Sequence, residues 1–237
     1  MRNYQYNALG LRRTDAAWLI FYVIILVIDI SFIHQDVDFY RWFSKPVLML
    51  TLLIVLWRTA DYEFKYAFRL HFLALFLSWI GDIFLLTDLF ITGLIAFLWA
   101  HICYIALMVD LGIRLKGIRF WSRSILTLII AGGVGYYIGH HHPDLQWAIL
   151  AYTVVILIMF QFSTLVKPYA PIIIAGALFF VISDFLLAYG RFIPPFDWHI
   201  LAEWKAEAVM FTYGLAQLLL LLGFRKVGRS QNLIFSK

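Results

Sequence analysis

The sequence predicts an all-α fold, a polytopic membrane helix bundle of eight transmembrane helices. Hydrophobic residues make up 63% of its 237 positions and charged residues 14%, whereas a soluble domain has roughly 45–50% apolar and about 25% charged residues. The mean hydropathy is +0.85, and the apolar residues gather into runs of about the length that crosses a bilayer. The whole chain, residues 1–237, is therefore interpreted as a single transmembrane domain.

Eight apolar runs are long enough to be spans, each close to the roughly 20 residues that a bilayer requires. The first begins near Ala16 and is expected to be retained, because it lacks a small-x-small cleavage site. The second carries Ser44, Lys45 and Pro46 near its start, which makes it the least regular. The expected spans are 16–34, 42–57, 69–87, 89–109, 122–139, 145–166, 170–189 and 202–224.

The basic residues give the orientation. If the eight runs alternate across the membrane, fifteen Lys and Arg residues fall on the side of the two termini. The other side holds four, which are Arg41, Lys45, Arg191 and Lys205. Because cytoplasmic loops are enriched in Lys and Arg, this distribution predicts an N-in/C-in topology. It also accounts for the net charge of +5 without a nucleic-acid partner.

Two segments resemble each other across the chain. Residues 75–86 (LFLSWIGDIFLL) align with residues 177–188 (ALFFVISDFLLA) when Asp82 is placed on Asp184. The offset corresponds to four spans, so the third and seventh spans run in the same direction. This favours a 4+4 parallel repeat of the kind found in membrane folds, although chance similarity between apolar segments is the alternative.

Ionisable residues inside the spans are the first candidates for function. Each costs about 2.5–3.5 kcal/mol at the centre of a bilayer on insertion scales, so such residues are rarely kept without a role. The set is Asp29, Lys45, Asp82, Asp184 and Glu207. By helix rise, all five lie within roughly 5–8 Å of the outer boundary. Five charges at one depth on five helices predict a polar chamber in the outer half of the bundle.

Several polar residues are spaced to join this chamber. Ser78 lies one turn below Asp82, and Gln217 shares a stripe of the last span with Glu207. His101 and Tyr104 share a face of the fourth span, nearer the midplane. Each has a plainer interpretation as an interhelical hydrogen-bonding residue, as does Tyr213, and Lys45 can snorkel to the interface.

Motifs of several familiar enzyme classes are absent. The sequence contains no G-x-S-x-G elbow, no H-E-x-x-H and no P-loop. The residues inside the spans also do not assemble the several histidines and carboxylate that a membrane zinc hydrolase needs. We therefore expect no metal and no cofactor.

Four ordered segments resemble the YhhN family, which includes lysoplasmalogenase-like integral membrane hydrolases. They are S-W-I-G-D at 78–82, A-F-L-W-A-H-I-C-Y at 96–104, G-A-L-F-F-V-I-S-D-F-L-L-A at 176–188 and T-Y-G-L-A-Q at 212–217. Lys45 and Pro46 fit the family pattern more loosely. Gly214 departs from it, since a second tyrosine would be expected after Tyr213.

The resemblance implies a hydrolase that cleaves the vinyl ether bond of lysoplasmalogens, the alkenyl-glycerophosphoethanolamines or -cholines. The products would be a fatty aldehyde and the glycerophospho-base. The family's paired aspartates correspond to Asp82 and Asp184. The expected partners are a lysophospholipid substrate and membrane lipid, in the inner membrane if the source is bacterial. The natural head group and the oligomeric state stay open.

The chemistry requires a proton donor for the vinyl ether, a base for water and a negative field near the cation that forms. Two carboxyl groups, one protonated and one ionised, supply these in a low-dielectric site. His101 and Tyr104 are expected to orient water or the hemiacetal, with Ser78, Glu207, Tyr213 and Gln217 as supporting polar groups. Lys45, Arg191 and Lys205 are expected to bind the phosphate head group.

Two other classes of function compete with this hypothesis. Intramembrane carboxylates and a repeat also suit a proton-coupled transporter of a small or lipid-like substrate. A non-catalytic lipid-binding protein is the other class, and its function would survive replacement of both aspartates by asparagine.

Overall fold

The computed structural model describes residues 13–59, 65–113, 118–167, 170–192 and 204–235, and this part of the chain is helical without strands. It contains eight long helices, each overlapping one expected span. They are α1 (Arg13–His34), α2 (Asp38–Thr59), α3 (Lys65–Leu85), α4 (Phe90–Asp110), α5 (Ile118–His141), α6 (Gln146–Ser163), α7 (Ala170–Phe192) and α9 (Lys205–Phe235). A short 3-10 helix, η2 (Pro143–Leu145), joins α5 to α6.

Seven of these helices are long and apolar enough to cross a membrane, as expected of a multi-pass membrane protein. The exception within the described ranges is α5. It includes Arg119, Arg123 and four glycines, which lower its mean hydropathy. Its central residues Leu128 and Ile129 are nevertheless largely exposed. Seven of the eight expected spans thus correspond to helices that are long and apolar enough to cross a membrane, whereas the crossing by α5, the orientation and the repeat stay predictions.

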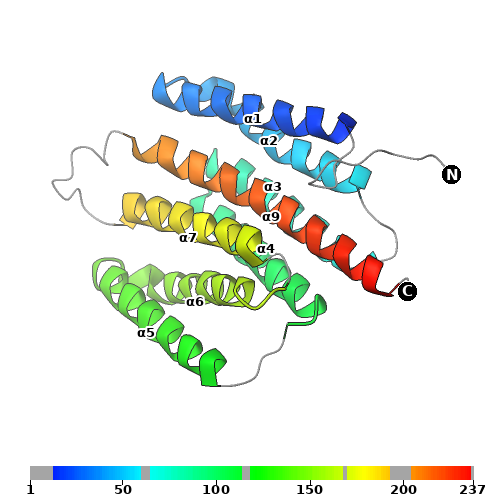
Figure 1. Cartoon of the computed structure of the whole chain (residues 1–237). Coiled ribbons are helices and arrows are strands. Elements are labelled where there is room, and N and C mark those ends of the chain that lie inside the picture. Colours follow the sequence, from blue (N-terminus) through cyan, green and yellow to red (C-terminus); the bar gives the residue numbers. More distant parts are fainter. Residues whose placement is uncertain (1–12, 60–64, 114–117, 168–169, 193–203, 236–237) are drawn as a thin grey trace.

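Seven helices form a ring, and α5 lies outside it (Figure 1). Consecutive helices pack as the hairpins α1–α2, α3–α4, α5–α6 and α7–α9. Further contacts of α2 with α3, α4 with α6, α6 with α7, and α9 with α1 close the ring. The helix α5 reaches this ring by packing on α6. The ring therefore positions polar residues from distant parts of the sequence around a shared interior.

Polar contacts hold α5 to α6. The Gln161 side chain on α6 donates from Nε2 to the Ser124 hydroxyl at 2.9 Å and to the Phe120 carbonyl at 3.2 Å. Its Oε1 accepts from the Thr127 hydroxyl at 3.3 Å. Because all these partners lie on α5, a buried glutamine uses both ends of its amide to join the two helices.

Small residues bring helices of the ring close together. A methyl group added to Gly81 on α3 would lie 2.7 Å from the Phe97 ring on α4. One added to Gly176 on α7 would lie 2.9 Å from Leu220 on α9. Close backbone approach at small residues is a common way of packing helices in lipid.

The ring exposes apolar side chains outward and turns polar ones inward. Ile20, Ile24 and Val27 on α1 are all at least half exposed, as suits a face that contacts lipid. In contrast, the buried polar side chains gather on the inner faces of the helices and include Asp29, Ser78, Asp82, His101 and Gln217. Membrane bundles place polar groups in this way because lipid cannot satisfy them.

Candidate functional site

Three helices converge on Asp184. The Tyr152 hydroxyl on α6 donates a hydrogen bond to Oδ2 of Asp184 at 2.5 Å. The Nε2 atom of His101 on α4 lies 3.2 Å from the same oxygen and 3.2 Å from the Tyr152 hydroxyl. Both contacts use Oδ2, and Oδ1 has no hydrogen-bond partner among the residues that the structure describes. One carboxyl oxygen is therefore held and the other is available.

The His101 ring is fully buried and its orientation is informative. An ionised carboxylate can only accept hydrogen bonds, so with Asp184 ionised the Nε2 atom of His101 carries the proton. Its Nδ1 atom then is a buried acceptor without a hydrogen-bond partner in the described part of the chain. Buried polar atoms are nearly always satisfied, so this nitrogen marks a place where a water or a ligand hydroxyl would bind.

An apolar cavity of about 480 Å³ adjoins this cluster, and Asp184 and Tyr152 are on its wall. Its volume is within the roughly 300–1,000 Å³ of small-molecule sites. The cavity lies between α5, α6, α7 and the start of α4. Most of its wall is aliphatic or aromatic, with Phe90, Ile130, Ile149, Ile156, Phe185 and Phe192 among the lining residues. Such a space suits an apolar chain with a single carboxyl group beside it.

Two of the cations predicted for the head group lie near one end of this cavity. The Arg191 guanidinium sits 5.1 Å from the centre of the Phe90 ring, which lines the cavity. Lys205, at the start of α9, lies against Gly190 of α7. Arg191 follows Asp184 by two helical turns, or about 10 Å along the axis. The arrangement places positive charge at a short distance from the carboxyl group.

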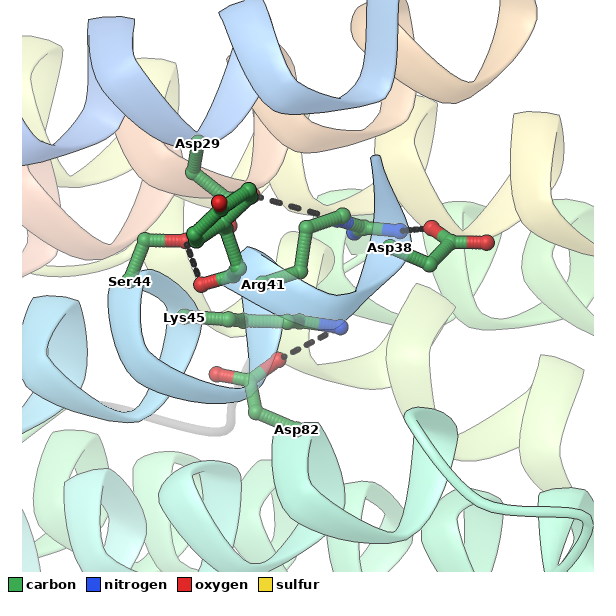
Figure 2. A network of polar contacts seen from close by, with 7 residues as sticks. Asp29, Asp38, Arg41, Ser44, Lys45 and Asp82 are labelled. Atoms are coloured by element: carbon green, nitrogen blue, oxygen red, sulfur yellow. Dashed lines mark hydrogen bonds and ion pairs between the residues drawn. The ribbon is translucent and has the colours of Figure 1, made fainter. Parts of the chain in front are cut away.

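Asp82 belongs to a second cluster (Figure 2). Its Oδ1 lies 3.3 Å from Nζ of Lys45 on α2, and its Oδ2 accepts from the Tyr213 hydroxyl on α9 at 2.7 Å. Both carboxyl oxygens are thus occupied, and the side chain is 1% exposed. Lys45 points inward to Asp82 and is buried, and its expected role in binding a head group stays a prediction.

The polar contacts extend from Asp82 toward α1. Asp29 on α1 accepts a hydrogen bond from the Ser44 hydroxyl at 2.5 Å and pairs with Arg41 at 3.8 Å. Arg41 also pairs with Asp38 at 3.4 Å, as Figure 2 shows. Figure 2 shows Asp29 with its partners close to Lys45 and Asp82, whereas a polar chamber that joins them stays a prediction. Glu207 is apart and pairs with His34 at 3.3 Å.

An aromatic partition separates the two aspartate clusters. Tyr213, which binds Asp82, packs edge-on against Phe97 and Phe180, with ring centres 5.7 and 5.6 Å away. On the other side, Phe180 packs 4.6 Å from the ring of His101, which contacts Asp184. Asp82 is not among the residues that line the cavity. Asp82 thus does not line the cavity beside Asp184, and a hollow that both aspartates share stays a prediction.

The remaining predicted residues are buried but lie away from the cavity wall. The Tyr104 hydroxyl donates to Oε1 of Gln217 at 2.7 Å. Ser78 is fully buried, and its hydroxyl has no hydrogen-bond partner among the described residues. Tyr152 could not be identified from the sequence, because its apolar surroundings gave no signal. The pairing of Asp29 with Arg41, whose side chain is 18% exposed, could not be predicted either.

Comparison with protein families gives one match. The model of the YhhN family matches residues 40–224, well over half of the chain. The matched region includes Asp82, His101, Tyr152 and Asp184, whereas α1 with Asp29 lies before it. Comparisons with curated proteins and with solved structures find no match.

Proposed function

This chain belongs to the YhhN family, and from that premise we propose that it is a membrane hydrolase of lysoplasmalogens. It would cleave the vinyl ether bond to release a fatty aldehyde and a glycerophospho-base. One observation supports this most directly. Asp184 lines an apolar cavity of about 480 Å³ while one of its oxygens lacks a hydrogen-bond partner in the described residues.

The first step is proton transfer to carbon. The protonated Asp184 carboxyl gives its proton to the β carbon of the vinyl ether, and the double-bond electrons form the new C–H bond. This leaves an oxocarbenium ion and an Asp184 carboxylate beside it. A negative charge fixed next to a developing cation in an apolar cavity lowers the barrier, because little solvent reorganises there.

The second step is the addition of water. Water attacks the oxocarbenium carbon and Asp184 takes up the released proton, which gives a hemiacetal and restores the acid. In the collapse, Asp184 gives that proton to the glycerol oxygen, which leaves, and takes up the proton of the hemiacetal hydroxyl, whose oxygen becomes the aldehyde carbonyl. One carboxyl group therefore alternates between acid and base, and the net reaction consumes one water.

Tyr152 and His101 hold Asp184 for this cycle. Because both contact Oδ2, they fix the carboxyl plane and leave Oδ1 toward the substrate. The unpartnered Nδ1 of His101 is an acceptor suited to water. Arg191 and Lys205 provide positive charge for the phosphate near the cavity end.

Asp82 has a positioning role in this proposal. It holds Tyr213, which supports Phe97 and Phe180, and Phe180 packs on His101. Asp82 is thus connected to the cluster of His101, Tyr152 and Asp184 only indirectly. Its replacement should disturb His101 through packing without removing a group that exchanges protons with the substrate.

Aldehyde release from lysoplasmalogen by the purified protein in detergent is the test. Wild type should release aldehyde, and Asp184→Asn should lower the rate by at least about 100-fold, the lower bound for a general acid–base group. Asp144→Asn is a matched control, since Asp144 is exposed in η2. Wild-type activity no higher than the detergent background, or full activity of Asp184→Asn, would refute the proposal.

A proton-coupled transporter is the second candidate, and the charged series in Figure 2 favours it. Asp38, Arg41 and Asp29 follow one another in contact between α2 and α1, and Lys45, one turn further along α2, pairs with Asp82 on α3. Chains of buried ionisable groups are typical of proton pathways. Substrate-dependent proton movement in liposomes without aldehyde formation would support this function over hydrolysis.

A further inference from the structure

The cavity beside Asp184 opens on the outer surface of the bundle between α5 and α7. Four of its large lining side chains are also exposed, namely Ile130 and Tyr137 on α5 and Ile182 and Phe185 on α7. Their exposed fractions range from 36% to 58%, so this part of the wall is at the same time part of the surface. Because α5 and α7 both pack on α6, the opening lies between two helices that flank a third.

The rim of this opening is apolar. Ile130, Ile182 and Phe185 have no polar atoms in their side chains, and Tyr137 carries a single hydroxyl at its tip. Such a mouth at the side of a helix bundle faces the lipid chains. A polar head group would lose its hydration at this rim without finding a polar partner. The rim therefore suits the apolar part of an amphiphile.

Gly133 keeps the mouth open. It lines the cavity from α5, and a methyl group added to it would meet no atom within 4 Å. The neighbouring Gly132 has equally free surroundings but does not line the cavity. Gly135 differs from both, because a methyl group there would lie 2.9 Å from Leu150 on α6. A side chain at position 133 would thus enter the cavity without displacing the protein.

We propose that the opening between α5 and α7 admits one apolar chain of a single-chain amphiphile sideways from the membrane, and that Gly133 is a specificity-determining residue at this opening. The choice of a single chain follows from the cavity volume of about 480 Å³, which is in the range of small-ligand sites rather than of two-chain lipids. That the bound amphiphile is a substrate rests on the proposed function. The route of the chain rests on the cavity and its rim.

Photolabelling tests the route without turnover. The Asp184→Asn protein in nanodiscs would be exposed to lysophosphatidylcholine with a diazirine in its chain, and labelled peptides would be mapped by mass spectrometry. Saturable labelling is expected within residues 118–141 and 170–192. A diazirine on a two-chain phosphatidylcholine should label these helices without saturation. Equal, unsaturable labelling of all lipid-facing helices by the single-chain probe would overturn the proposal.

The glycine pair gives the matched variants. Gly133→Leu should lower the saturable labelling about tenfold or more, because one methylene in an apolar pocket changes selectivity by roughly 10–200-fold. Gly132→Leu brings the same gain in helix propensity but adds its side chain outside the cavity, so labelling should be unchanged. Equal effects of the two variants would refute the role of Gly133.

Hydrolysis of long-chain and short-chain vinyl ethers separates this inference from the proposed function. Gly133→Leu should lower kcat/KM more for the long chain than for the short one. If wild type cleaves neither substrate but the labelling behaves as expected, the hydrolase proposal fails and the lateral route stands. If wild type cleaves both, and the two leucine variants match it in turnover and labelling, the route fails and the hydrolase stands.

Discussion

Asp82 and Asp184 have similar sequence surroundings but opposite environments in the bundle. Asp82 has a lysine 3.3 Å from one oxygen and a tyrosine hydroxyl 2.7 Å from the other, and it is 1% exposed. Asp184 has both of its partners on one oxygen, and its side chain is 12% exposed beside a cavity. The closed site at Asp82 resembles a structural ion pair. The open site at Asp184 has the access that a reacting carboxyl group needs. Equivalent positions in two similar segments therefore do not imply equivalent roles.

The largest expected difference is in activity. Asp184→Asn should reduce aldehyde release by about 10²–10⁴-fold, the usual contribution of general acid–base catalysis. Asp82→Asn should reduce it far less, because Asp82 acts only through Tyr213 and the aromatic partition. Rates of both variants would be compared at equal amounts of folded protein. An equal loss of activity in both variants would contradict the expected difference and would indicate that Asp82 also takes part in the reaction.

Stability should show the reverse order. Lys45→Met leaves Asp82 as an uncompensated buried charge, and breaking a buried ion pair on one side costs about 3–5 kcal/mol. The double variant Lys45→Met with Asp82→Leu should recover most of this loss, since apolar pairs of similar volume replace buried ion pairs well. Unfolding in detergent would be followed by circular dichroism. Lys167→Met is the control, because Lys167 is exposed. A double variant as unstable as the single one would contradict the ion-pair interpretation.

The two tyrosines allow a finer comparison. Tyr152→Phe removes a hydrogen bond to Asp184, the carboxyl group that we propose as acid and base, and hydrogen bonds to charged groups contribute about 1.5–3 kcal/mol. We expect kcat to fall about 10–100-fold with KM nearly unchanged. Tyr213→Phe removes the corresponding bond at Asp82 and should mainly lower the unfolding midpoint. If steady-state kinetics show the larger fall in kcat for Tyr213→Phe, the assignment of the open and closed sites is reversed.

The smallest expected effect concerns the head group. Arg191 is exposed, and exposed ion pairs contribute about 0.2–1 kcal/mol. Arg191→Gln should therefore raise KM only a few-fold and leave kcat unchanged, whereas Arg191→Lys should stay close to wild type. The effect should shrink with added salt, because salt screens exposed charges. A fall in kcat instead of a rise in KM would place Arg191 nearer the reacting atoms.

Much of the fold could be predicted from the sequence, because helix length and apolar composition are local properties. The marginal hydropathy of α5 also has a local cause, in Arg119, Arg123 and the glycines. The partners of the aspartates could not be predicted. Lys45 and Tyr213 lie on α2 and α9, while His101 and Tyr152 lie on α4 and α6. These neighbours depend on the order of helices around the ring, for which spacing along a single helix carries no information.

The amide of Gln161 has a consequence for how the chain enters the membrane during synthesis. The helix α5 leaves the ribosome first, and its arginines and glycines weaken its own partition into lipid. Gln161 on α6 is equally unfavourable alone, yet its partners are the Ser124 and Thr127 hydroxyls and the Phe120 carbonyl, all on α5. Each helix thus supplies what the other lacks, so we expect α5, where it crosses the membrane as predicted, to insert together with α6 as a hairpin.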